Sequence, residues 1–294
     1  MTRTKNISLV IILFLPFTLF GCSLGAKKDT VKNKSTISVK TEFEEQPSVD
    51  LHFDEYSIIF GFSNETGKNI LAISDTLPEP GIYKKTIVDN GDLIPLKFVE
   101  QKTGVEDKDY QLTYYNFSNC GGYLFECSDG IVNYKKSVVM LSDKFLSNRK
   151  YIKNVSKEKN PLGTDVLEQI KILKHKEIKN SFPLVKIDNN RSLYIVNFEI
   201  VNDTAMFSFV LVSPNKLVTK DNIAEFDPYG TWRVDDGGVV NPEMFDILAV
   251  FESKFGIEIA INWIGAEGDY IEYLIENGNQ LEMGKNEYRY TLPN

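Results

Sequence analysis

The sequence has little of the chemistry that most enzymes use, since its 294 residues include two histidines, three cysteines and two tryptophans. His52 and His175 lie far apart, which excludes the His-Glu-x-x-His zinc motif and leaves a Ser–His–Asp or Cys–His nucleophile with little support. Residues 61–69 have five residues between their glycines, and Asn69 stands where a phosphate-binding loop needs Ser or Thr. We therefore predict no cofactor and no metal site.

The sequence has fewer basic than acidic residues: 33 Lys and Arg and 41 Asp and Glu, which give a formal net charge of −8. Nucleic-acid binding requires a basic surface that neutralises phosphates, so we predict no nucleic-acid partner. After residue 22 no apolar run reaches the roughly 20 residues that span a bilayer. The hydrophobic fraction of 42% is typical of a globular chain.

The most distinctive stretch is the first 22 residues. Arg3 and Lys5 precede a nearly continuous apolar run over residues 7–20, which has the length of the apolar region of a secretory signal peptide. The run ends in the sequence LFGC at residues 19–22, with an apolar residue three positions before the cysteine and a small residue directly before it. This pattern resembles the lipobox of bacterial lipoproteins.

The resemblance implies that Cys22 receives a diacylglyceryl group and becomes the first residue after cleavage. Residues 1–21 are then a signal peptide, and residues 22–46 are a lipidated, lysine-rich tether. Two or more acyl chains hold a protein stably on a bilayer, so we expect a chain anchored at the extracytoplasmic face of the cell membrane. The alternatives are a plain signal peptide with a free cysteine and an uncleaved membrane helix.

Cys120 and Cys127 remain after Cys22 is set aside, and an even pair in an exported chain favours a disulfide. Gly121 and Gly122 suggest a turn that leads into a strand over residues 122–125, so the bridge would close a small loop and contribute a little under 3 kcal/mol. Two free thiols are the alternative. The histidines are too distant in sequence to complete a metal site with this pair.

Short apolar runs between turn-rich segments predict an α+β, β-rich fold. Residues 47–142 should form an antiparallel β domain, with a hairpin at Asn90-Gly91 and candidate strands over 110–117 and 131–134. Residues 143–163 are interpreted as a connector. Residues 164–294 should form an α+β domain, in which a helix over 165–179 leads into an antiparallel meander. Its clearest hairpin joins residues 193–200 to 205–212.

Charge is distributed unevenly along the second half of the chain. Residues 135–180 carry twelve Lys and Arg against five Asp and Glu, whereas residues 181–294 carry eight against eighteen. The two segments are expected to attract each other, or the basic segment faces a polyanion of the membrane or wall.

Both tryptophans lie in acidic loops that contain glycine. The candidate ligand-binding residues are Trp232, Asp235, Asp236, Trp263, Glu267 and Asp269. Such loops can stack a sugar or a peptide side chain on Trp while carboxylates accept hydrogen bonds. The carboxylates are also candidate calcium ligands, and a correctly spaced pair can hydrolyse a glycoside. The plain alternative is that the tryptophans anchor the core and the acids cap turns.

These observations favour a membrane-anchored surface lipoprotein that acts as a non-enzymatic binding or protein-interaction module, with an envelope protein or a wall polymer as its partner. The enzyme alternative is a carboxylate-dependent hydrolase acting on wall glycan or peptide. A third hypothesis is an immunity-type lipoprotein that sequesters a toxic protein. No catalytic residue is predicted, and the globular part resembles no known family.

Overall fold

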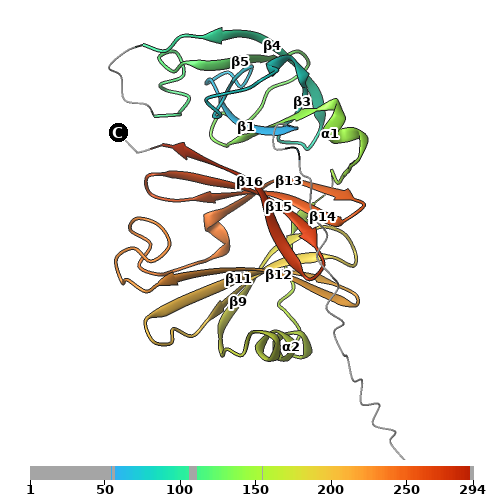
Figure 1. The fold of residues 1–294 in the computed structure, drawn as a ribbon, viewed down its shortest axis with the longest axis vertical. Helices are drawn as coiled ribbons and strands as arrows, with labels where there is room; N and C mark the ends of the chain where they lie inside the picture. The colour runs from blue at the N-terminus through green and yellow to red at the C-terminus, as the bar shows by residue number, and fades with distance from the viewer. Residues whose placement is uncertain (1–53, 55–56, 106–110, 154, 292–294) are drawn as a thin grey trace, which may run out of the picture. The chain divides into compact units, whose positions relative to one another are not determined.

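The computed structural model describes residues 54, 57–105, 111–153 and 155–291. Cys22, the signal peptide and the tether lie outside the described residues, so their assignment stays a prediction. The described chain forms an antiparallel barrel, a ten-stranded curled sheet and a few helices (Figure 1), which confirms the β-rich α+β class. Within this part of the chain, no helix has both the length and the apolar character needed to cross a bilayer.

The first part of the chain closes into a barrel of six strands in the order β1-β2-β5-β4-β3-β6, with antiparallel pairing throughout. The strands are β1 (Ile58–Ser63), β2 (Asn69–Ala72), β3 (Tyr83–Ile87), β4 (Leu93–Lys102), β5 (Gly122–Cys127) and β6 (Val138–Ser142). A short 3-10 turn, η1 (Pro80–Ile82), precedes β3. The hairpin predicted at Asn90-Gly91 is confirmed, because β3 pairs with β4 across it and Gly91 has a positive φ of 76°.

Two candidate strands of this region are wrong. Residues 110–117 and 131–134 form no strand where the structure describes them, and residues 114–119 are turns. The aromatic side chains that suggested strands contact one another instead, with the rings of Tyr114 and Tyr134 centred 4.6 Å apart. Side-chain packing between two loops thus replaces strand pairing here.

The second part of the chain forms one sheet in the order β7-β13-β14-β15-β16-β12-β11-β10-β9-β8. Its strands are β7 (Lys150–Tyr151), β8 (Ser156–Lys157), β9 (Ile178–Lys186), β10 (Ser192–Phe198), β11 (Thr204–Ser213), β12 (Lys216–Glu225), β13 (Phe245–Ser253), β14 (Gly256–Ile264), β15 (Gly268–Asn277) and β16 (Gln280–Tyr290). The 3-10 turn η2 (Pro242–Met244) precedes β13. Two antiparallel meanders, β9–β12 and β13–β16, are joined by one parallel pairing of Thr219 with Gln280. The predicted β10–β11 hairpin is confirmed.

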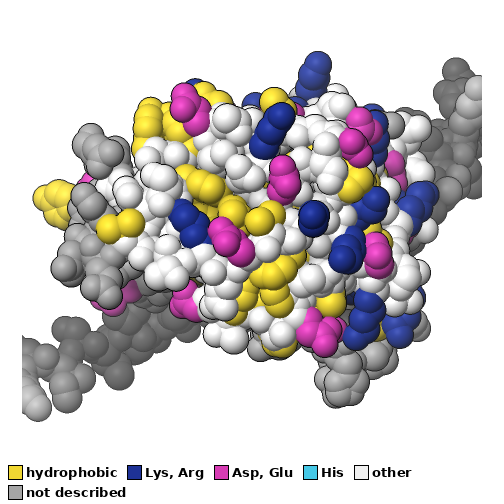
Figure 2. Space-filling model, turned by 90° about the horizontal axis from the view of Figure 1, so that it is seen from above, with side chains coloured by type: hydrophobic (Ala, Val, Ile, Leu, Met, Phe, Trp, Pro, Cys, Tyr) yellow, Lys and Arg dark blue, Asp and Glu magenta, His cyan; other side chains and the backbone are white. Residues whose placement is uncertain are grey.

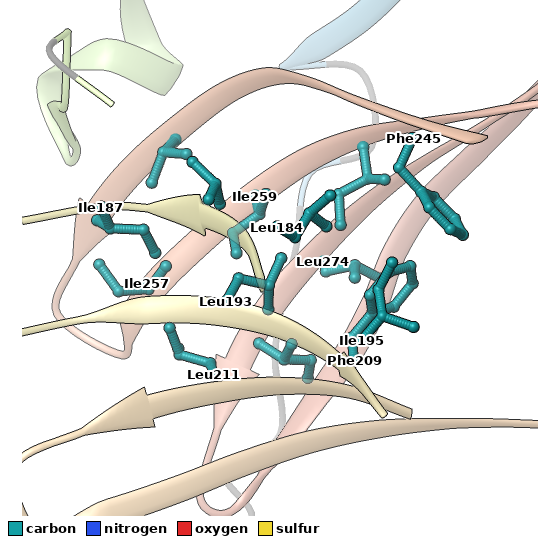
Figure 3. Close-up of a cluster of buried hydrophobic side chains, with 14 of the residues drawn as sticks. Leu184, Ile187, Leu193, Ile195, Phe209, Leu211, Phe245, Ile257, Ile259 and Leu274 are labelled. Atoms are coloured by element: carbon teal, nitrogen blue, oxygen red, sulfur yellow. The ribbon is translucent and has the colours of Figure 1, made fainter. Parts of the chain in front are cut away.

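The sheet curls so that its two meanders enclose the largest core. Alternation along β14 explains why: Ile257, Ile259 and Ile261 face the other meander, whereas Glu258 and Ala260 lie on the opposite face. Figure 3 shows Ile257, Ile259 and Leu274 opposite Leu193, Phe209 and Leu211. Each such fully buried side chain contributes about 1.5–3 kcal/mol of transfer free energy, so this layer carries much of the stability of the fold.

The outer faces of the curled sheet are also covered. The barrel packs on β13–β15 through a shared core that includes Phe60, Phe145, Phe251 and Tyr273. Helix α2 (Thr164–Lys174) packs its Ile170 against the outer face of β10–β12. Because the barrel and the sheet share a core, the division of the chain at residues 142–143 and 163–164 into separate domains stays a prediction.

The predicted helix over 165–179 is too long by five residues at its C-terminal end. α2 ends at Lys174 because His175 adopts the left-handed conformation, with a φ of 51°, and residues from Ile178 onward pair with β10 as β9. The helix starts after Gly163, and Asp165 stands in its first turn as predicted. Strand pairing therefore overrides the local helical pattern beyond residue 174.

The interval 143–163 is more than a connector, because it contains α1 (Asp143–Ser147), β7 and β8. Ion pairs join the basic and acidic segments, as the charge distribution predicts. They are Lys136–Asp246 at 3.0 Å, Lys150–Glu252 at 4.0 Å, Lys174–Asp221 at 2.8 Å and Arg149–Glu258. Internal attraction is confirmed for these residues.

The disulfide predicted between Cys120 and Cys127 is wrong in this structure, in which both thiols are free and buried. The strand predicted to follow the glycines is confirmed as β5, and its five steps of about 3.3 Å carry the chain about 16 Å. The two residues before β5 span at most about 7 Å, so they cannot bring Cys120 within the roughly 7 Å that a bridge requires. Cys127 belongs to the barrel core, and Cys120 packs with Phe62 and Leu71.

We expect dithiothreitol to leave the thermal unfolding midpoint unchanged to within about 1 °C, because no bridge constrains the chain. A bridge closing so short a loop would contribute nearly 3 kcal/mol, and its reduction would lower the midpoint by several degrees. Differential scanning calorimetry with and without reductant distinguishes free thiols from a disulfide bridge. A large drop on reduction would show that the cysteines are bridged.

Candidate functional site

Three connections meet at one end of the curled sheet: the β10–β11 turn (199–203), the β12–β13 loop (226–241) and the β14–β15 loop (265–267). The amide of Phe226 donates to the carbonyl of Asp203 at 2.7 Å, which ties the first two connections together. The guanidinium of Arg233 donates to the carbonyl of Trp263 at 2.7 Å, which ties the second to the third. We call these three connections the loop end; it unites the two acidic loops singled out in the sequence.

Asp236 organises the 226–241 loop through its carboxylate. Its Oδ1 accepts from the amides of Thr231 at 3.0 Å and Gly238 at 2.8 Å. Its Oδ2 accepts from the amide of Trp232 at 2.8 Å and from that of Arg233. Both oxygens are thus occupied by backbone donors of their own loop. The role of Asp236 in the structure is to shape the loop, as the plain interpretation of the acids expects.

We expect Asp236→Ala to lower the free energy of unfolding by about 1–3 kcal/mol, because four backbone donors lose a charged acceptor. Asp235→Asn is the matched control. Asp235 is exposed with a φ of 62°, a conformation that Asn tolerates, so its replacement should stay within about 0.5 kcal/mol of the wild type. Urea unfolding of both variants checks this. Equal effects would contradict the assigned role.

The two tryptophans lie side by side with ring centroids 6.5 Å apart. Both contact Phe207 edge-on, at 4.9 Å for Trp232 and 5.3 Å for Trp263. Trp263 is buried, and its indole N–H has no hydrogen-bond partner among the described residues, so it anchors the core. Trp232 is only partly buried and remains available at the surface of the loop end.

The remaining two candidate carboxylates point to different surroundings. Asp269 is 8% exposed and faces Arg289 at 3.5 Å and the hydroxyl of Ser137 at 3.3 Å, where the barrel meets the sheet. Burial raises the pKa of Asp269, and the charge of Arg289 opposes that shift. Glu267 is half-buried, and its carbonyl accepts from the amide of Thr291 at 2.9 Å. Neither carboxylate lines any of the three cavities described below, nor does that of Asp235 or Asp236.

Trp232 lines a pocket of about 270 Å³ at the loop end. Its apolar walls come from three different strands and the loop, and include Phe182, Phe198, Met206, Phe226, Trp232 and Val240. The side-chain amide of Asn197 fixes one wall by donating to Asn180 Oδ1 at 2.8 Å and to the carbonyl of Val240 at 2.9 Å. We call this cavity the Trp232 pocket. Lys179 is the one Lys or Arg among its lining residues.

Two larger grooves lie at the barrel, with volumes of about 500 and 520 Å³. The two lysines that line them are already paired, Lys136 with Asp246 at 3.0 Å and Lys153 with Asp92 at 2.5 Å. Figure 2 looks at the barrel side and shows basic and acidic side chains interspersed over that face. In the part of the chain that the structure describes, no group of three or more His, Cys, Asp or Glu is placed to hold a metal ion.

Several residues of the loop end escape prediction from sequence. Arg233 follows Trp232 directly in the sequence. No local sequence pattern shows that its guanidinium donates to the carbonyls of Trp263 and Gly268. Phe182 comes from β9, which is remote in sequence from the tryptophans, and only the curl of the sheet brings it to the pocket.

Comparison of the chain with models of protein families, with curated proteins and with solved structures found no match.

Proposed function

We propose that the protein is a membrane-anchored lipoprotein of the bacterial envelope whose loop end binds another envelope component without catalysis. The observation that carries the binding role is the Trp232 pocket, an apolar cavity held open by a loop whose shape is fixed by Asp236. A preformed cavity lowers the conformational entropy lost on binding, which favours recognition. The anchor is supported by the lipobox-like sequence at residues 19–22.

The hydrolase alternative requires two carboxylates that converge on a substrate. Asp236 is occupied by backbone amides, and Asp269 is buried beside Arg289. Neither arrangement leaves an acid–base pair facing the Trp232 pocket. The placement of these groups supports a binding role over turnover.

The test uses the full-length protein in detergent, with two bait pools: purified cell wall and solubilised envelope. The proposal predicts stoichiometric retention on one pool and no release of wall fragments. Release of glycan or peptide fragments that disappears in the Asp235→Asn/Glu267→Gln variant would overturn it in favour of the hydrolase. A tight complex with one toxic protein would instead identify the immunity-type role.

A further inference from the structure

The size of the Trp232 pocket restricts what it can hold. Its volume of about 270 Å³ is below the roughly 300–1,000 Å³ of typical small-molecule sites. Its walls are mostly aromatic and aliphatic, and its mouth includes the exposed side chains of Ile200 and Val239, at 38% and 53% exposure. The cavity therefore suits one large apolar group that enters from outside and remains attached to a larger partner.

The surroundings of the pocket are strongly acidic. Seven exposed carboxylates lie within two residues of a pocket-lining residue. Glu177 pairs with Lys171 at 2.7 Å, and the other six are Glu199, Asp203, Glu225, Asp227, Asp235 and Glu243. In the described part of the structure, none of the six forms an ion pair with a Lys or Arg. Uncompensated negative charge around an apolar pocket repels an anionic polymer and attracts a cationic partner.

The loop end is also held in place before any partner arrives. Asp236 fixes the 226–241 loop, and the Arg233 guanidinium attaches that loop to the carbonyls of Trp263 and Gly268. The ring of Phe226 lies where a Cβ on Gly238 would come within 2.7 Å, so this glycine allows the close approach that forms one wall. A rigid, apolar, acid-rimmed cavity is complementary to an anchor residue within a basic sequence.

From these three features we propose that the loop end binds a basic polypeptide segment that inserts one large apolar side chain into the Trp232 pocket. The proposal rests on the binding function above and names the chemistry of its partner. The apolar anchor supplies most of the affinity, because buried aromatic anchors dominate interfaces. The carboxylates supply long-range attraction, which screening by salt weakens.

The experiment measures fluorescence anisotropy of labelled nine-residue peptides with the full-length protein in detergent. The probe carries a central Trp flanked by Lys and Arg; one matched peptide replaces the Trp with Ala, and another replaces the bases with Glu. We expect each replacement to raise Kd at least about tenfold. Binding of the basic peptides with equal affinity, whether or not Trp is present, would overturn the insertion of an anchor.

Matched variants of the protein locate the site. Glu199→Gln/Asp203→Asn/Asp235→Asn removes three carboxylates from the loop end and should raise Kd about three- to tenfold at low salt. The control triple Glu100→Gln, Glu126→Gln and Glu168→Gln changes the net charge equally elsewhere and should leave Kd unchanged. Equal losses in both triples would overturn the assigned surface.

A third variant separates the pocket from the charge. Val239→Asp adds negative charge at the mouth, so it should weaken the Trp peptide without weakening the Ala peptide. Thermal unfolding confirms that each variant folds. If no peptide binds but the wild-type protein still retains an envelope component, this inference alone fails. Loss of retention as well would overturn the proposed function.

Discussion

Replacement of Cys22 by Ser should abolish incorporation of fatty acid into the protein. Under the proposed function the thiol of Cys22, at the end of the lipobox-like sequence of residues 19–22, accepts the diacylglyceryl group, and a hydroxyl should not substitute for it. Each buried CH2 of the acyl chains contributes about 0.8 kcal/mol to membrane attachment, so the effect on anchoring is large. Growth with an alkyne-tagged fatty acid, followed by immunoprecipitation, measures it.

The controls for this experiment come from the other two cysteines. Cys120→Ala and Cys127→Ala remove buried thiols of the barrel region and should leave labelling intact. An unlabelled wild-type protein in the medium would indicate a plain signal peptide, and an unlabelled full-length protein in the membrane would indicate an uncleaved helix. Labelling that persists in Cys22→Ser would show that the lipid is attached elsewhere.

Arg289→Met should lower the free energy of unfolding by about 3–5 kcal/mol at pH 7, because it leaves Asp269 buried without its cationic partner. The Arg289 side chain is 3% exposed and also donates to the carbonyl of Leu112 at 2.8 Å and the hydroxyl of Ser137 at 3.3 Å. It thereby links the barrel to the sheet.

The loss should depend on pH in a definite direction. Burial raises the pKa of Asp269 above its unfolded value, so the folded state binds the proton more tightly. The stabilisation from that proton is complete below the unfolded pKa of about 3.9 and is lost as pH rises through the folded pKa. Without Arg289 the folded pKa rises further, so the destabilisation of Arg289→Met should be small near pH 4 and should grow toward pH 7.

Urea unfolding of the wild type and Arg289→Met at several pH values tests this dependence. The double variant Arg289→Met/Asp269→Leu removes both charges and should recover most of the lost stability, since a buried pair replaced by apolar groups is often neutral. Equal destabilisation at every pH, or a double variant as unstable as the single one, would contradict the assigned coupling between Asp269 and Arg289.

Local sequence patterns were sufficient for the fold class and for several elements. The apolar runs over residues 193–200 and 205–212, joined by a short polar loop, predict the β10–β11 hairpin, and Asn90-Gly91 predicts the turn between β3 and β4. Local patterns failed where distant residues decide. The helix stops at Lys174 because β9 pairs with β10, and the predicted disulfide is wrong because β5, which pairs with β2 and β4, holds Cys127 far from Cys120.

For the candidate site too, local sequence predicts some features, whereas others depend on contacts between distant residues. The composition of the two tryptophan loops indicated where the loop end lies, but the partners of each carboxylate depend on the folded chain. Asp236 binds donors from its own loop, whereas Asp269 meets Arg289 across the β15–β16 pairing. The Trp232 pocket requires Phe182 from β9, and the curl of the sheet that brings it there has no local sequence signal.

Photo-crosslinking in living cells can test whether the loop end is the binding surface of an anchored protein. A photoreactive amino acid is introduced either at Val239, at the mouth of the Trp232 pocket, or at Glu100, an exposed position on the barrel strand β4. If the loop end binds the partner, we expect one dominant crosslinked polypeptide from position 239 and none from position 100. The triple variant Glu199→Gln/Asp203→Asn/Asp235→Asn should weaken the crosslink from position 239. A crosslink of equal strength from both positions, or from position 100 alone, would contradict this expectation.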